Sequence, residues 1–263
     1  MTLKLAALTM IGLSAQPVAF AQKTEADPWS QADEVWGAEQ MKPARQQVLR
    51  HHGDTTATYF QAERFELQSF DDEEVLLLDG NAWTGGDINK LWFKTELEYL
   101  PEEGEFEEAE LQALWSRAIS PYWDFQAGVR QDFEPESRTH IVAGFQGLAP
   151  YLFETDAAAF LSTEGDLTAR VEAEYELLLT QRLILQPRIE AGFSAQDIPE
   201  LETGAGLTGI DAGLRLRYEI RRTFAPYIGI EWQESFSDTA EMIEARGGET
   251  GKAAVIFGVR AWY

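Results

Sequence analysis

From about Tyr59 to the carboxyl end, apolar and polar residues alternate along the chain in segments of roughly ten residues. In 167–177 the odd positions are apolar, and the even positions from Arg170 to Glu176 are all charged. The segments 90–99, 184–191 and 213–220 repeat the pattern. A period of two, rather than 3.6, predicts β-strands that have one apolar and one polar face.

This alternation predicts twelve strands over most of the chain. We expect them at about 58–69, 74–84, 90–100, 107–118, 123–133, 138–147, 151–162, 166–178, 182–193, 209–220, 225–236 and 253–263. Strands that cross a bilayer at a tilt need about 9 to 11 residues, whereas strands of soluble sandwiches usually have about five or six. The sequence therefore predicts an all-β protein, a twelve-stranded antiparallel transmembrane β-barrel. A secreted soluble β-protein with its apolar faces inward is the alternative.

Aromatic residues support the membrane interpretation because they fall near the ends of the predicted strands. Outer-membrane barrels carry aromatic girdles at both membrane interfaces. We expect in these girdles Trp83, Trp92, Tyr99, Tyr122, Trp123, Phe133, Tyr151, Phe153, Phe224, Tyr227, Trp232 and Phe236.

The connections between the predicted strands differ in length on the two sides of the barrel. The even-numbered connections are short, and the odd-numbered ones include the two longest, 194–208 and 237–252. Outer-membrane barrels have short periplasmic turns and longer outer loops. We therefore expect both termini of the barrel to be periplasmic, and the last residues, 257–263, to form a closing strand.

The amino terminus has the features of a secretory signal. Lys4 precedes a short apolar stretch, and Ala19-Phe20-Ala21 has the small-x-small form of a cleavage site. We expect cleavage after Ala21. The predicted organisation is a cleaved signal peptide at 1–21, a largely irregular periplasmic N-terminal arm at 22–56 and the barrel at 57–263.

Composition narrows the function classes. The chain has 45 acidic against 21 basic residues and a net charge of -24, which opposes binding to nucleic acid. Its 44% hydrophobic content is enough for a folded structure. It has no cysteine, so His, Met and carboxylates are the metal ligands that the sequence offers.

Strand parity directs many charged side chains toward the barrel interior, because a base on the lipid face near the bilayer midplane would cost about 2 to 4 kcal/mol. These acids and arginines can pair with one another, and any carboxylates left over can hold a divalent cation. The predicted inward charges are Glu96, Glu98, Glu110, Asp124, Arg130, Asp132, Glu154, Asp156, Arg170, Glu172, Glu174, Arg188, Glu190, Arg215, Arg217, Glu219, Glu231 and Arg260.

Five long segments, 82–98, 111–133, 144–160, 169–190 and 213–232, resemble copper resistance protein B, and the similarity covers about 57–263. The resemblance implies a monomeric barrel in the outer membrane of a Gram-negative cell, surrounded by lipid, that binds copper ions and contributes to copper resistance and homeostasis. It implies a copper ion as the cofactor, and neither an organic cofactor nor enzyme activity. Periplasmic copper-resistance proteins are candidate partners, and which of them would bind stays open. The direction of copper movement and the oxidation state stay open.

Two places offer candidate copper ligands. The family commonly has a Met- and His-rich region before the barrel, and here 22–56 contains only Met41, His51 and His52. His51 and His52, followed by Gly53-Asp54, are candidate Cu(II) ligands or part of a solvated linker. In the barrel, His140 opens the sixth strand, and inward Glu154, Asp156 or Asp132 on adjacent strands would complete a mixed nitrogen and oxygen site with it.

Two other functions are compatible with such a barrel. A hydrolase of the outer-membrane phospholipase type would need a His-x-Ser pair, but Ile141 and Val142 follow His140, and the chain has no Gly-x-Ser-x-Gly motif. We therefore do not expect an enzyme. A nonselective cation-preferring pore, or a purely structural barrel, needs only the acidic interior and is the main alternative to copper handling.

Overall fold

The computed structural model describes residues 30–52, 55–71 and 73–263, with the side chains of 30 and 49–52 excepted. The predicted signal peptide, 1–21, lies outside the described residues. The chain divides into two units, Met1–Gly53 and Asp54–Tyr263. In the described part of the first unit, helices replace the largely irregular arm expected from the sequence: η1 (Ser30–Ala32), α1 (Asp33–Trp36) and α2 (Ala38–His52).

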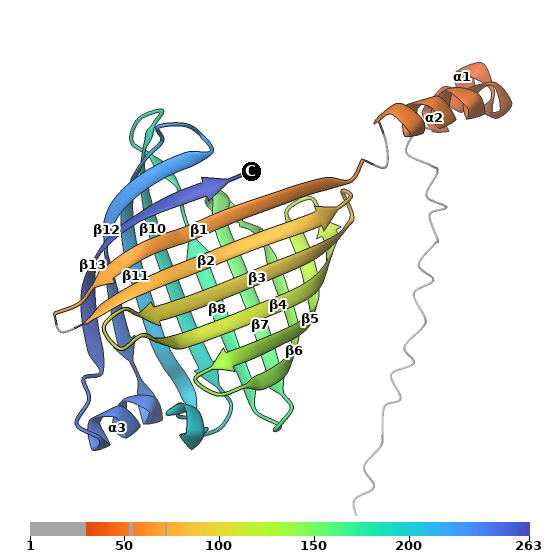
Figure 1. The fold of residues 1–263 in the computed structure, drawn as a ribbon. Coiled ribbons are helices and arrows are strands. Elements are labelled where there is room, and N and C mark those ends of the chain that lie inside the picture. The colour runs from red at the N-terminus through yellow and green to blue at the C-terminus, as the bar shows by residue number, and fades with distance from the viewer. Residues whose placement is uncertain (1–29, 53–54, 72) are drawn as a thin grey trace, which may run out of the picture. The chain divides into compact units, whose positions relative to one another are not determined.

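The second unit is a single antiparallel sheet that closes on itself (Figure 1). Its strands are β1 (Ala57–Ser69), β2 (Glu74–Gly85), β3 (Asn89–Leu100), β4 (Glu105–Ser120), β5 (Trp123–Glu134), β6 (Arg138–Ala149), β7 (Phe153–Ser162), β8 (Leu167–Glu174), β9 (Leu177–Leu178), β10 (Leu183–Ser194), β11 (Gly206–Tyr218), β12 (Phe224–Ser235) and β13 (Gly251–Trp262). Apart from β8 and β9, which both pair with β10, each strand pairs with the next in the chain, and β13 pairs with β1. The predicted twelve-stranded barrel is confirmed, with β8 and β9 together forming the eighth strand.

The break between β8 and β9 has a local cause in the neighbouring strand. The register pairs Arg188 with Glu174 and Leu185 with Leu177, so Tyr175 and Glu176 lie opposite Gln186 and Pro187 of β10. Proline has no backbone N–H to donate to a ladder. Regular pairing therefore lapses here, although the Tyr175 N–H still donates to the Pro187 carbonyl at 3.1 Å.

The barrel closes where its first and last strands meet. Leu67 pairs with Phe257 and Gln61 with Trp262 across β1 and β13. The Phe60 N–H donates to the Tyr263 carbonyl at 3.0 Å, and the Tyr263 N–H donates back at 2.9 Å. The last residues of the chain thus satisfy the edge of the first strand, and neither edge is left unpaired.

The two ends of the barrel carry connections of different kinds (Figure 1). The end that holds both chain ends of the barrel has short turns, one of which contains η2 (Pro150–Leu152). The opposite end has the two longest loops, which contain η3 (Pro199–Leu201) and α3 (Ser237–Ala245). We call these the terminus end and the loop end. The sequence pattern did not predict α3.

Side-chain burial follows the predicted parity along the strands. In β6, Arg138, His140 and Val142 are buried inside, whereas Ile141 is 65% exposed on the outer surface. Ile230 and Phe257 are also exposed on the outside. This arrangement is the inverse of a soluble sandwich, because the apolar side chains face outward. In the described ranges, no helix is both long and apolar enough to span a bilayer.

Candidate functional site

The polar face of every strand meets in the barrel interior, as the alternation predicts. Arg215, Arg217 and Glu231 are only 2–3% exposed. A β-bulge adds to this set, because Ala62 pairs with Gly80 and Arg64 pairs with the adjacent Asp79, which leaves Glu63 as an extra residue. Glu63 and Arg64 are consecutive, yet both line the interior. A strict period of two could not have predicted that pair.

Arginines join the carboxylates into a network across the middle of the barrel. Arg170 Nη1 lies 2.9 Å from Glu96, and Arg64 Nη2 lies 2.8 Å from the other oxygen of Glu96. Arg170 also contacts Glu110 at 3.3 Å and Glu190 at 3.3 Å. Since these groups come from β1, β3, β4, β8 and β10, the ion pairs connect walls that are distant along the sheet.

The network continues toward β11 and β12 through the most buried charges of the barrel. Arg215 donates to both oxygens of Glu66, at 3.1 and 2.8 Å, and Tyr227 donates to Glu66 at 2.8 Å. Arg215 also lies 3.1 Å from Glu231. Beside this cluster, the apolar side chains Val75, Leu77, Ala254 and Ile256 are 0–4% exposed. This part of the interior is filled by packed side chains.

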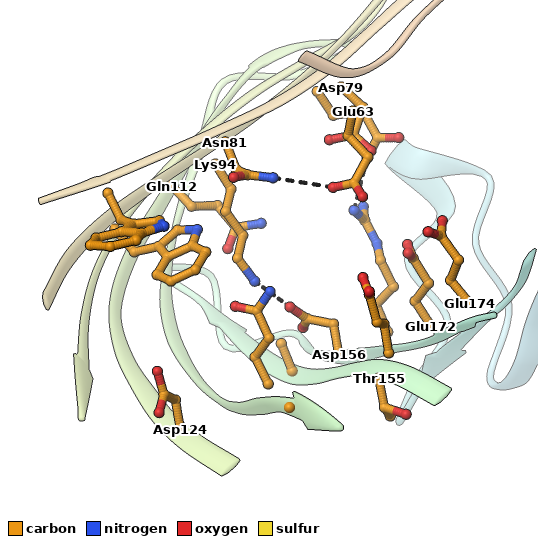
Figure 2. Close-up of a pocket in the computed structure, with 18 of the residues that line it drawn as sticks. Glu63, Asp79, Asn81, Lys94, Gln112, Asp124, Thr155, Asp156, Glu172 and Glu174 are labelled. Carbon is orange, nitrogen blue, oxygen red and sulfur yellow. Dashed lines mark hydrogen bonds and ion pairs between the residues drawn. The ribbon is translucent and has the colours of Figure 1, made fainter. Parts of the chain in front are cut away.

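A cavity of about 520 Å³ occupies the interior on the other side of the network (Figure 2). It reaches the terminus end, because Pro121 and Tyr122 of a short turn help to line it. Four basic side chains line it: Arg64, Lys90, Lys94 and Arg170. Its ten carboxylates are Glu63, Asp79, Glu96, Glu110, Asp124, Glu154, Asp156, Glu172, Glu174 and Glu190. The cavity is therefore strongly acidic.

Some cavity carboxylates have their own cation and others do not. Lys94 pairs with Asp156, and Lys90 lies 3.1 Å from Asp124. Figure 2 shows the Lys94–Asp156 pair and the Asn81 amide that donates to Glu63 at 3.1 Å. Carboxylate oxygens come within 4.8 Å of one another in two groups of three, Glu63–Glu154–Glu174 and Glu96–Glu108–Glu110. These groups are the acidic clusters of the described residues that are tight enough for one cation.

Two tryptophans of the cavity depart from the sequence prediction. Trp83 and Trp92 line the cavity with their rings stacked at a centroid distance of 5.9 Å, and Tyr227 is buried beside Glu66. These three aromatics therefore do not belong to the membrane girdles. Each lies at a position whose side chain faces the interior in the alternating pattern of its strand. The sequence prediction assigned them to the girdles because they lie near strand ends.

His140 meets one of the acids predicted to accompany it. Its Nε2 lies 2.9 Å from Asp132 Oδ2, and Arg130 donates to the other oxygen of Asp132 at 2.5 Å. His140 is 6% exposed, and its Nδ1 has no hydrogen-bond partner among the described residues. The histidine, the carboxylate and the arginine form a compact buried group near the loop end.

Glu154 and Asp156 lie far from that histidine. The register pairs His140 with Ser162, but it pairs Gln146 with Asp156 and Leu148 with Glu154. At about 3.3 Å per residue, six residues of β7 place Asp156 roughly 20 Å from the level of His140. Of the three carboxylates predicted as alternative partners, Asp132 thus lies with His140 near the loop end, and Glu154 and Asp156 lie in the cavity. His51 and His52 end α2, and their side chains lie outside the described ones.

Comparison with known proteins identifies the family. Residues 56–263 match the family model described as copper resistance protein B precursor. The chain is 45% identical over 202 residues to copper resistance protein B of Escherichia coli, covering 76% of this chain and 68% of that protein. The chain belongs to the copper resistance protein B family.

A second relative agrees with this assignment, and a solved structure shares the fold. The copper resistance protein B homolog of Pseudomonas syringae pv. tomato is 41% identical over 213 residues, covering 81% of this chain and 72% of that protein. The NanC porin structure superposes with a TM-score of 0.51 at 10% identity, covering 78% of this chain and 99% of that chain, and so shows the shared fold alone. Family and fold together support an outer-membrane location.

Proposed function

We propose that the chain contributes to copper resistance at the outer membrane by binding copper ions in its barrel interior or passing them through it. The observation that carries this proposal is the interior cavity, in which ten carboxylates face four basic side chains. Such an excess of negative charge in a confined, low-dielectric space attracts and concentrates cations. The names of the relatives supply copper as the cation concerned.

The cavity opens on the side where we expect the periplasm. The terminus end has the short turns, and the loop end has the long connections with η3 and α3. Short periplasmic turns and long outer loops are the rule for outer-membrane barrels. In this orientation the acidic cavity faces the periplasm, where partner copper-resistance proteins could exchange copper with it, and His140 lies toward the cell exterior.

Growth of a deletion strain tests the function. Loss of the gene should increase sensitivity to copper salts but leave sensitivity to zinc and nickel salts unchanged, and the intact gene should restore growth. A nonselective pore or structural barrel predicts the same change for all three metals, or none. Either of these results would remove the copper-specific function in favour of the main alternative.

The histidines provide a second test of copper binding. We propose His140 with Asp132 as one mixed-ligand locus, because nitrogen and oxygen donors suit Cu(II), and the His51–His52 pair as another. The purified mature protein should be titrated with Cu(II) and with Cu(I), with His140→Ala and a double His51→Ala, His52→Ala variant in parallel. Unchanged stoichiometry in both variants would remove the histidines from the ligand set.

We further propose that the barrel acts as a monomer and without catalysis. Each strand finds both of its neighbours within one chain, so the fold needs no second copy to close. A test for esterase or phospholipase activity on detergent-solubilised protein should show no turnover above that of a lipid blank.

A further inference from the structure

The carboxylates of Glu63, Glu154 and Glu174 converge in the acidic cavity although they come from opposite walls. Glu154 of β7 and Glu174 of β8 are direct cross-strand partners. Glu63 reaches them from the β1 bulge, and β7 is the sixth strand from β1 around the barrel. One oxygen of each lies within 4.8 Å of the others. Like charges this close, with two directly opposite each other on paired strands, repel one another unless a cation lies between them.

Glu174 provides an independent sign that something is bound there. The residue is 5% exposed, and its Oε1 atom has no hydrogen-bond partner among the described residues. The Arg260 Nη1 atom is 3.8 Å away, which is too far for a hydrogen bond. A buried carboxylate oxygen without a donor carries a desolvation cost that a bound metal ion would remove.

The local charges leave room for a divalent cation. Arg260 is engaged mainly by Glu176, at 2.8 Å, and Arg217 contacts the same oxygen of Glu176 at 2.6 Å. Arg260 reaches Glu63 only at 3.5 Å. The four acids Glu63, Glu154, Glu174 and Glu176 therefore face the two arginines, and two negative charges remain, the charge that one divalent ion neutralises.

The second acidic cluster differs because arginines contact all of its carboxylates. Glu110 lies 2.6 Å from Arg130 and 3.3 Å from Arg170, and Glu96 lies 2.8 Å from Arg64. Glu108 is within 3.8 Å of the same Arg130. Each of its three carboxylates thus contacts an arginine, and none of their oxygens is buried without a hydrogen-bond partner among the described residues.

We propose that Glu63, Glu154 and Glu174 form a divalent-cation site and that copper held there is Cu(II) rather than Cu(I). The choice of copper rests on the proposed function, whereas the site rests on the geometry. Carboxylate oxygens are poor ligands for the soft Cu(I) ion, which prefers sulfur. Among divalent first-row ions, a given oxygen site binds Cu(II) most tightly.

Two variants of one strand test the site. Glu154→Gln removes a proposed ligand, and the Glu154 side chain makes no hydrogen bond or ion pair with other residues the structure describes, so folding should be preserved. Asp156→Asn is the matched control, because it removes the same charge from the same cavity two positions along β7, where Lys94 holds the carboxylate. Full-length mature protein in detergent should be dialysed against Cu(II), and the bound ion recorded by electron paramagnetic resonance.

We expect Glu154→Gln to weaken Cu(II) binding roughly tenfold or more, because loss of an outer-shell partner alone typically costs about ten- to hundredfold, and to change the spectrum of the bound ion. Asp156→Asn should retain wild-type affinity and spectrum. Unchanged binding in Glu154→Gln would overturn the site, as would equal losses in both variants, which would indicate general attraction by the cavity. Both variants should first show the heat-dependent gel mobility of a folded barrel.

Competition decides which cation the site accepts. Ca²⁺ and Mg²⁺ at a hundredfold excess should leave Cu(II) bound, and Cu(I) under reducing conditions should not occupy the site. Displacement by the hard cations would overturn the Cu(II) assignment. If the deletion strain shows no copper phenotype while Glu154→Gln still weakens Cu(II) binding, the proposed function fails and the site stands, so the two failures are distinguishable.

Discussion

Individual glutamates of the interior have different roles because their partners differ. Glu66 accepts hydrogen bonds from Arg215, Tyr227 and Gln68, and it is 1% exposed. Glu154 has none of these contacts and faces the cavity. The first carboxylate is a structural cross-link, and the second is available to a ligand.

Truncation of Glu66 should strongly destabilise the barrel. Glu66→Ala leaves the Arg215 guanidinium and the Tyr227 hydroxyl buried without their main acceptor. Removal of one partner of a buried ion pair typically costs about 3 to 5 kcal/mol. The free energy of unfolding, measured by urea titration in lipid vesicles, should fall by this amount, whereas Glu103→Ala in an exposed turn should change it little. A fall of less than about 1 kcal/mol would contradict the cross-linking role.

At the scale of elements, two irregularities adapt regular strands to the interior. The β1 bulge turns both Glu63 and Arg64 inward, and Pro187 interrupts the ladder between β8 and β9. The interruption lies beside Glu174 and Glu176, so both irregularities occur at residues around the proposed cation site. Regular strands would have placed one fewer charge there.

The bulge makes β1 tolerant of one particular deletion. Deletion of Glu63 leaves Ala62 and Arg64 consecutive, facing outward and inward as regular pairing requires. The shortened protein should fold, and the fraction with folded gel mobility should stay near that of the wild type. Deletion of Phe65 is the control, because it can be accommodated only by turning a charged neighbour toward lipid or by shifting the register. Equal folding of the two variants would argue against the bulge.

At the scale of the whole molecule, the ion-pair network separates the cavity from the filled part of the interior. Arg170 is its central member, with contacts to Glu96, Glu110 and Glu190. Any ion that crosses the barrel must pass this group, so passage of copper requires the network to rearrange. Binding in the cavity does not require that change.

Removal of Arg170 should therefore open the barrel to cations. In planar bilayers, Arg170→Ala should increase single-channel conductance over the wild type and shift the reversal potential toward cation selectivity, because the freed carboxylates line the path. Arg182→Ala, in an exposed turn at the terminus end, removes the same charge outside the network and should leave conductance unchanged. Identical conductance in the wild type and Arg170→Ala would show that the barrier lies elsewhere.

The prediction from sequence was most accurate where a residue's environment depends only on whether it occupies an odd or an even position in its strand. Leu214 and Ile230 face outward, and Arg215 and Glu231 face inward, as their strand positions indicate. The prediction could not single out Asp132 from Glu154 and Asp156 as the carboxylate beside His140. The alternation along a strand predicts which face of the sheet a side chain occupies. The position of that side chain along the barrel axis depends on the register between β6 and β7.

The sequence by itself determined the number of strands, their order and which face of each regular strand meets lipid, because period-two alternation and the high cost of a charge in hydrocarbon are local properties of each segment. Only the tertiary structure decided which interior charges meet. Glu63 and Glu174 are more than a hundred residues apart in the chain, and closure of the barrel brings their carboxylates together. Ring closure, strand register and a single bulge set those distances. None of these three features can be inferred from the residues of one strand, because each depends on how strands pair.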